Sequence, residues 1–248
     1  MKTSRFALVL MVLATLSFSA CAPKVSQKIV FGSDATFPPM EFVDAQKNVV
    51  GFDIDMINAV AKAGGFEASV KNTAWDGIFA GLTAGDYDAV LSSVTITDER
   101  KGTMDFSTPY VNAGQVIIVP KSTTSVSKPD DLVGKKVGVQ IGTTGDIAVA
   151  KIAKVTKKTY DEIGLAVEDL SIGRLDAVVV DSPIAANYVL QNDKYKAKLQ
   201  IVGAPFTEEF YGVAVKKGNS KVLDLVNKGL AAIQKDGTLD KLKAKWLQ

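Results

Sequence analysis

Apolar and polar residues alternate along the chain in two spacings, one typical of strands and one typical of helices. Residues 28–34 form a short apolar run that ends in turn residues, which predicts a buried strand. Residues 53–63 place apolar side chains on one face and stop at Gly64-Gly65, which predicts a helix. Strands and helices keep alternating, so we expect an α/β fold whose mostly parallel sheets are covered by helices on both faces.

The same rules place the remaining elements. We expect strands over residues 66–71, 87–91, 114–120, 135–141, 178–180 and 199–202, and an apolar stretch over 210–216. We expect helices over residues 75–84, from 98, from 146, from 222, and in a last segment that ends at 246. Pro38-Pro39 keeps residues 37–40 in a loop, because proline suits neither a helix interior nor a strand ladder.

One segment occurs twice, at an offset of 88 residues. Residues 82–96 and 170–184 coincide without a gap at Leu, Gly, Asp-Ala-Val and a final Ile. The copies differ where their strands end, with Ser93 in the first and Asp181 in the second. The repeat predicts two lobes of one plan, whose strand ends face each other across a cleft.

We expect the chain to cross between the lobes twice, near Val119 and near Thr207. Lobe 1 then consists of residues 28–118 plus 207–248, and lobe 2 of residues 119–206. Two crossings suit a hinged clamshell, and ligands of open α/β sheets bind beyond the carboxyl ends of the strands. The expected cleft residues are Asp34, Ser92, Ser93, Ile141, Gly142 and Asp181.

The first 20 residues are typical of an export signal. Lys2 and Arg5 precede an apolar segment, residues 6–16, that is too short to span a membrane as a mature helix. Small residues before Cys21, the one cysteine of the chain, resemble a bacterial lipobox, in which this cysteine becomes the lipidated first residue of the mature protein. Phe18 stands where leucine is more usual, so simple cleavage after Ala20 is the alternative. Residues 21–27 are then the lipidated cysteine and a linker.

Composition removes several classes of function. Lys2 and Arg5 account for the formal net charge of +2, so the mature chain is balanced and nothing favours nucleic-acid binding. The chain has no histidine, and its one cysteine lies at the expected processing site. Disulfides, cysteine nucleophiles, Ser-His-Asp triads and histidine-ligated zinc are therefore excluded. We expect no cofactor and no bound metal.

Residues 92–100 carry the strongest local signal for a binding site. Alternation along an extended segment puts Ser93 and Thr95 on one side, and Arg100 can fold back over them. Two hydroxyls and a guanidinium fork suit a carboxylate. The alternative is a solvated arginine beside Asp98 and Glu99, with hydroxyls that only cap a turn.

Two further segments lie at expected strand ends. Residues 142–146, which include Thr143 and Thr144, follow a strand and open a helix, so their N–H groups suit an anion, although the lysine and spacing of a P-loop are absent. The alternative is an ordinary turn. Asp181 either caps the helix that Pro183 begins or faces the cleft, where it would pair with an ammonium group.

Phe37 and Trp75 are the candidate aromatic walls. Phe37 lies in the proline-fixed loop just beyond a strand end, whereas Trp75 at a helix start is the more natural core residue. Two aromatic faces suit an aliphatic or cationic side chain between them.

Several separated motifs in the correct order resemble the bacterial extracellular solute-binding proteins of the polar amino-acid class, the substrate receptors of ABC importers. The resemblance covers residues 28–248. Its markers are residues 32–39 (GSDATFPP), 51–55 (GFDID), 75–77 (WDG), 92–100 (SSVTITDER), 105–110 (DFSTPY), 138–144 and 176–183. It implies a two-lobed clamshell that closes on a free amino acid.

The resemblance also implies a role for each candidate residue. Arg100 binds the α-carboxylate with help from Thr95 and from the N–H groups of Ser93 and Thr144. Asp181 binds the α-ammonium together with the carbonyl of Ser92. The remaining members of the site are Phe37 and Trp75, which flank the ligand side chain, Asp34 and Gln140, which reach its far end, and Thr143. Trp75 replaces a phenylalanine that is frequent in the family, which affects the side-chain pocket.

Asp34 and Gln140 favour arginine or another basic amino acid, with glutamine next. The implied partners are a free amino acid and a membrane permease, and we expect an exported monomer, in the periplasm or at the cell surface, anchored through Cys21. Two other functions compete with transport. One is a dehydratase-type enzyme on the same scaffold, and the other is a ligand-sensing accessory of a membrane receptor.

Overall fold

The computed structural model describes residues 26–247. The expected export signal and the expected lipidation site at Cys21 lie outside the described residues. Within the described range, no helix has the length and apolar character that crossing a membrane requires.

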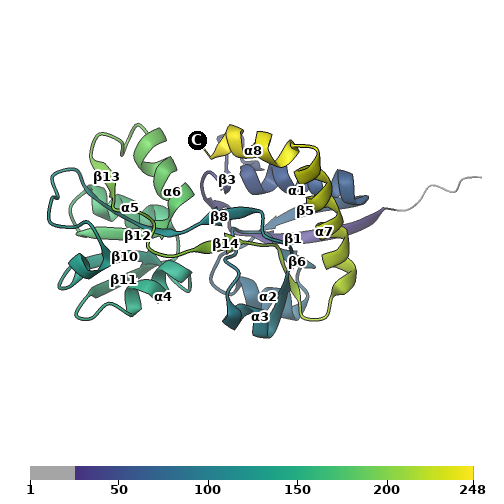
Figure 1. The fold of residues 1–248 in the computed structure, drawn as a ribbon, viewed down its shortest axis with the longest axis horizontal. Helices are drawn as coiled ribbons and strands as arrows, with labels where there is room; N and C mark the ends of the chain where they lie inside the picture. Colours follow the sequence, from purple (N-terminus) through teal and green to yellow (C-terminus); the bar gives the residue numbers. More distant parts are fainter. Residues whose placement is uncertain (1–25, 248) are drawn as a thin grey trace, which may run out of the picture.

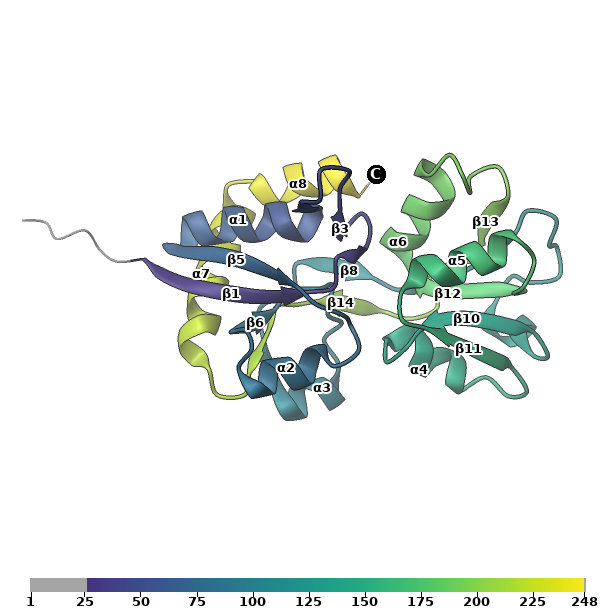
Figure 2. The same cartoon turned by 180° about the vertical axis from the view of Figure 1, so that it is seen from behind.

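The chain folds into two lobes, each built on a five-stranded sheet (Figures 1 and 2). The first sheet has the order β5-β1-β6-β15-β7. Its strands are β5 (Phe66–Asn72), β1 (Gln27–Ser33), β6 (Ala89–Val90), β15 (Ala214–Lys216) and β7 (Met104–Phe106). The second has the order β11-β10-β12-β9-β13. Its strands are β11 (Thr156–Tyr160), β10 (Lys136–Gln140), β12 (Ala177–Asp181), β9 (Gln115–Pro120) and β13 (Leu199–Val202).

The two sheets share one topology. In each, three strands run parallel and the last two run antiparallel to their neighbours. Each sheet is thus mixed, because its fourth strand, β15 or β9, runs against the other four. The repeated Ala-Val pair falls in β6 and β12, which are the central strands of their sheets.

Helices cover both faces of each sheet, as the alternating pattern predicts. Along β1, Ile29 and Phe31 face one cluster of buried residues and Val30 faces another. The first face is covered by α1 (Phe52–Gly64), with α7 (Ser220–Lys235) and α8 (Thr238–Trp246) beside it, and the second by α2 (Ile78–Ala84), near α3 (Asp98–Thr103). In the second lobe, α4 (Thr144–Ala150) packs against one face, and α5 (Ile163–Ser171) and α6 (Ser182–Ala186) against the other.

Two antiparallel segments connect the lobes, β8 (Val111–Ala113) and β14 (Glu209–Tyr211), which pair with each other (Figure 1). The predicted first crossing near Val119 is wrong by several residues. Residues 115–120 already belong to the second sheet, because their apolar side chains are buried between β12 and β13. The crossing therefore lies at the end of β8.

Other expectations need smaller corrections. The second helix begins at Ile78, so Trp75 precedes it rather than opening it. The helix expected from residue 98 is α3, and Thr97 caps it, because the Thr97 side chain accepts a hydrogen bond from the N–H of Arg100. The polar strand β11 was not predicted, because it is an edge strand with mostly exposed side chains. The short elements complete the fold: β2 (Thr36–Phe37), β3 (Glu41–Val43), β4 (Val49–Val50), η1 (Pro129–Leu132) and the π-helical turn η2 (Asn187–Gln191).

Candidate functional site

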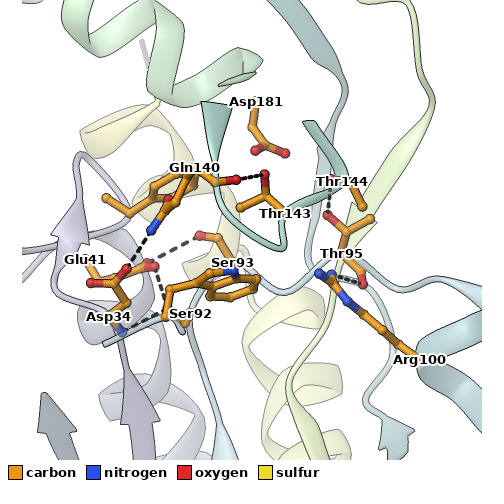
Figure 3. Close-up of a pocket in the computed structure, with 12 residues that line it drawn as sticks. Asp34, Glu41, Ser92, Ser93, Thr95, Arg100, Gln140, Thr143, Thr144 and Asp181 are labelled. Atoms are coloured by element: carbon orange, nitrogen blue, oxygen red, sulfur yellow. Dashed lines mark hydrogen bonds between the residues drawn. The ribbon is translucent and has the colours of Figure 1, made fainter. Parts of the chain in front are cut away.

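A cavity of about 320 Å³, including the solvent at its mouth, lies between the lobes where the parallel strands end (Figure 3). Its lining consists of Asp34, Phe37, Glu41, Trp75, Ser92, Ser93, Thr95, Arg100, Gln140, Thr143, Thr144 and Asp181. The structure thus brings together the eleven residues that were expected to bind the ligand, whereas Ile141 and Gly142, also expected at the cleft, are not part of this lining. The twelfth, Glu41, was not predicted.

Arg100 reaches across the cleft from the first turn of α3. Its guanidinium donates to the carbonyl of Thr95 at 2.9 Å and to the carbonyl of Gly142, in the other lobe, at 3.3 Å. The same group lies over the rings of Trp75 and Phe79. Burial lowers the pKa of Arg100, while the nearby charges of Asp181 and Glu209 raise it. Arg100 is therefore held at the cleft and is not a solvated partner of Asp98 or Glu99.

Asp181 ends β12 on the opposite side of the cavity. It occupies the position before α6, but its side chain makes no capping hydrogen bond. Its Oδ1 is buried and has no hydrogen-bond partner among the described residues. Burial raises the pKa of Asp181 to about 7, and the charge of Glu209 adds to the shift. Of the two roles that the sequence leaves open, the geometry favours the one in the cleft.

Asp34 and Gln140 meet at the far end of the cavity. The amide Nε2 of Gln140 donates to Oδ2 of Asp34 at 2.9 Å and to the carbonyl of Asp161 at 2.9 Å. Thr36 donates to the other oxygen of Asp34 at 2.8 Å. Burial raises the pKa of Asp34, and these hydrogen bonds lower it again. The two side chains close this end of the site by bonding across the lobes.

Ser92 and Ser93 rest on Glu41, which is fully buried in β3. The Ser92 hydroxyl donates to Oε1 of Glu41 at 3.1 Å, and the Ser93 hydroxyl donates to Oε2 at 3.3 Å. The N–H of Ser93 donates to Oδ2 of Asp53 at 3.0 Å. Since Ser93 has a φ of 49°, this bond holds an uncommon backbone conformation in place. It also uses the N–H that was expected to assist a ligand carboxylate.

Glu41, which lines the cavity, and the nearby Asp53 are two buried carboxyl groups. Burial raises the pKa of Glu41 well above its usual range, and the nearby Asp53 raises it further. Burial also raises the pKa of Asp53, to about 6, although bonds from Ser93 and Tyr110 oppose the shift. Asp53 opens the helix expected over residues 53–63, and its carboxyl group also accepts from Ser93 and Tyr110.

The aromatic residues form walls, as expected. Phe37 is buried beside the cis Pro38-Pro39 bond, and Trp75 is half-buried with its ring edge-to-face with Phe79. Trp75 is thus a cavity wall rather than a core residue. Thr143 caps α4 by accepting from the N–H of Asp146, and its hydroxyl donates to the carbonyl of Gln140.

Three buried polar residues of the region escaped the sequence analysis: Glu41, Gln115 and Glu209. Glu41 follows the proline loop directly, and Gln115 begins an otherwise apolar strand, so each is a polar residue in a segment that should be buried. Glu209 is buried at the start of β14, in the second crossing. A buried polar residue in an apolar segment was the available signal.

Known protein families include one whose model matches nearly the whole described chain. Residues 29–248 match the bacterial extracellular solute-binding proteins, family 3. The "Probable histidine-binding protein" of Neisseria gonorrhoeae is 41% identical over 249 residues, covering 94% of this chain and 91% of the relative. The "L-cystine-binding protein TcyJ" of Escherichia coli K12 is 40% identical over 220 residues, covering 88% and 82%.

Solved structures share the fold. An ancestral arginine-binding protein bound to arginine superposes with a TM-score of 0.84 at 45% identity, covering 89% of this chain and 98% of that one. An ancestral arginine-binding protein bound to glutamine gives 0.83 at 46% identity, covering 88% and 97%. An ancestral amino acid-binding protein described as a precursor of cyclohexadienyl dehydratase gives 0.82 at 39% identity, covering 89% and 96%. These likenesses agree with the two-lobed fold.

Proposed function

The chain belongs to the bacterial extracellular solute-binding proteins, family 3, and from that membership we propose that it is the receptor of an ABC importer that closes on a free polar L-amino acid. The observation that carries the proposal is the placement of opposite charges around one cavity. Arg100 enters from the first lobe, and Asp181 ends a strand of the second. A free amino acid carries a carboxylate and an ammonium on one carbon, so it joins these two groups as the lobes close.

The remaining residues divide between the backbone and the side chain of the ligand. Arg100 and the N–H of Thr144 bind the carboxylate, and Asp181 and the carbonyl of Ser92 bind the ammonium. Phe37 and Trp75 enclose the side chain, and Asp34 with Gln140 meets its far end. Thr143 supports the turn that carries Thr144.

A basic, arginine-like side chain suits the far end best, with glutamine next. Asp34 is the acceptor there, and beyond it a second hollow is shared by Asp34 and Trp75. Asp161 and Glu162 also line this hollow and add negative charge. A guanidinium or ammonium at the end of a side chain would face three carboxylates. A side-chain amide would bond to Asp34 and Gln140 but would carry no charge to pair with the other two carboxylates.

The export signal, the lipid anchor at Cys21 and a monomeric state belong to the same proposal. Such a receptor acts outside the cytoplasmic membrane and delivers its closed form to a permease. The proposed lobes are residues 28–110 plus 212–247 and residues 115–206, with β8 and β14 as the hinge. Delivery to a sensory receptor instead of a permease would use the same closed form.

We infer binding rather than catalysis. A dehydratase needs a group that protonates the departing hydroxyl, and the acids of the cavity have other partners. Asp34 accepts from Gln140 and Thr36, and Glu41 accepts from both serines. Asp181 is the acid left over, and the ligand ammonium requires it. Product formation from prephenate or arogenate would reverse this conclusion.

Thermal unfolding with a panel of amino acids tests the proposal. The protein is first unfolded and refolded to remove co-purified ligand, and mass spectrometry of the released molecules identifies what it carried. L-arginine, L-glutamine, L-histidine and L-cystine are then added singly. Ligand at a thousandfold excess over its Kd stabilises the folded state by about 4 kcal/mol. If no amino acid raises Tm, the proposal is wrong.

A further inference from the structure

Glu209 is a buried carboxylate at the hinge, directly behind the cavity wall. Its Oε2 accepts from the Thr95 hydroxyl of the first lobe at 2.9 Å and from the Thr144 hydroxyl of the second at 2.6 Å. Its Oε1 accepts from the Thr207 hydroxyl at 2.7 Å. Within residues 26–247, no lysine or arginine makes a salt bridge with it. Each of these neighbours donates, and the carboxylate oxygens of Glu209 accept.

These bonds set the direction of the threonine hydroxyls, because the 2.9 and 2.6 Å contacts with Glu209 are shorter than the 3.4 Å between the Thr95 and Thr144 hydroxyl oxygens. A hydroxyl has one proton to donate and two lone pairs with which to accept. Thr95 lines the cavity, yet its proton points to Glu209 and away from the ligand space. The Thr95 oxygen therefore offers the cavity only lone pairs. Thr144 is fixed in the same way, and its oxygen already accepts from Nε2 of Gln115 at 3.2 Å.

An oxygen that offers only lone pairs matches a donor and repels a carboxylate. The charge of Glu209 also acts on both ends of the site, because it raises the pKa of Asp181 and the pKa of Arg100. The hydroxyl of Thr95 is thus turned against the role that the family resemblance implies for it, which is to assist the carboxylate.

We propose that Glu209 is a positioning residue that makes the site selective for a ligand with an α-ammonium, by holding the Thr95 and Thr144 hydroxyls as acceptors. The inference rests on the proposed function, since it concerns the same cavity. Glu209 touches no ligand in this account. It acts through the two threonines, one on each side of the hinge.

The test compares Glu209→Gln with Glu208→Gln. Glutamine keeps the size of the side chain, but its NH₂ group donates, so a threonine proton is released toward the cavity. Glu208 is the matched control, because the adjacent residue carries the same charge on an exposed side chain. Affinities are measured for L-arginine and for its 2-hydroxy analogue, which has a hydroxyl in place of the ammonium. If another amino acid of the panel binds the unaltered protein more tightly, that amino acid and its 2-hydroxy analogue are used.

We expect Glu209→Gln to weaken L-arginine binding by about tenfold, the size of one hydrogen bond to a charged group. Binding of the hydroxy analogue should change by less than about threefold, and Glu208→Gln should change neither. A purely structural role for Glu209 would weaken both ligands equally, and that result, or no effect at all, would overturn the inference. Failure of the unaltered protein to bind any amino acid would instead overturn the proposed function.

A double-mutant cycle checks that Glu209 acts through Thr95, and Thr95→Val supplies evidence even if Glu209→Gln folds poorly. Thr95→Val should weaken the amino acid more than the hydroxy analogue. Glu209→Gln should change the ratio of the affinity for the amino acid to that for its hydroxy analogue. That change should be smaller when Thr95→Val is also present. Fully additive effects, or a larger loss for the hydroxy analogue in Thr95→Val, would contradict the proposal.

Discussion

Asp34 and Gln140, which bond to each other at 2.9 Å, occupy equivalent positions in the two lobes. Ala89-Val90 of β6 pairs with Phe31-Gly32 of β1, and its repeat Ala177-Val178 of β12 pairs with Val137-Gly138 of β10. Asp34 and Gln140 lie two residues beyond Gly32 and Gly138, respectively. The cleft thus brings together matching strand ends, at which the two lobes carry different side chains.

The negative charge of Asp34, opposite the neutral Gln140, predicts that Asp34 affects which amino acid the site prefers. Asp34→Asn removes the negative charge at the far end but keeps a group that can bond to Gln140. We expect it to weaken L-arginine binding by at least about tenfold, because a hydrogen bond to a charged group is lost, and to change L-glutamine binding much less. Isothermal titration of both amino acids measures the ratio. Equal losses for both would show that Asp34 does not read the ligand side chain.

Arg100 should be indispensable for binding. Arg100→Ala removes the fork that pairs with the ligand carboxylate, so affinity for any amino acid should fall at least about a hundredfold. Arg100→Lys keeps the charge but loses the fork and the stacking on Trp75, so it should rescue only part of the affinity. Arg174→Lys is the control, because that exposed side chain pairs with Asp169 on the surface. Near-normal binding by Arg100→Ala would refute the assignment.

Affinity should fall as the pH falls below 7. Burial raises the pKa of Asp181 to about 7 without ligand, and pairing with an ammonium lowers it. Below pH 7 the free protein holds a proton that binding must release, so linkage makes affinity at pH 5 about a hundredfold lower than its limit above pH 8. Titration with L-arginine, which does not change charge in this range, measures the profile. Asp181→Asn should bind weakly and show a flat profile, and a flat profile in the unaltered protein would contradict the role of Asp181.

Close packing of α1 on α7 predicts a stability effect at Gly229. A Cβ there would lie 2.2 Å from the carbonyl oxygen of Val60, so Gly229→Ala must push the helices apart. We expect the free energy of unfolding to fall by about 1–3 kcal/mol. Gly102→Ala, in α3 with nothing within 4 Å, should leave it unchanged or raise it by up to about 1 kcal/mol. Denaturant unfolding compares the two, and equal effects would contradict the packing argument.

Much of the lobe plan could be predicted from the sequence, because apolar periodicity follows which faces of a strand or helix are buried. The strands β1 and β10 and the helix α1 agree with their predicted ranges within one or two residues. The first crossing could not be predicted, since an apolar strand has the same pattern in either sheet. Only the pairing of Val116 and Ile118 with β12 decides its lobe.

The cavity residues could be predicted because they lie at strand ends and in turns of recognisable composition. Their mutual bonds could not. That Gln140 donates to Asp34, or that Thr95 and Thr144 both donate to Glu209, depends on how one lobe sits against the other. No local pattern contains that relation. Glu41 and Glu209 could have been noted as polar residues in segments expected to be buried, but their contacts with the serines and threonines could not.

The central claim is that Arg100 and Asp181 bind the two charges of one free amino acid. Isothermal titration of the refolded, ligand-free protein tests it most directly. The protein is titrated first with L-arginine, L-glutamine, L-histidine and L-cystine. It is then titrated with the decarboxylated and the 2-hydroxy forms of the amino acid that binds best. The account predicts saturable binding of one ligand per chain for at least one amino acid. It also predicts affinity at least about tenfold weaker when either charged group is missing, since each makes charge-assisted hydrogen bonds. The claim would be contradicted if no amino acid bound. It would also be contradicted if the decarboxylated and 2-hydroxy forms bound with the same affinity as the parent amino acid.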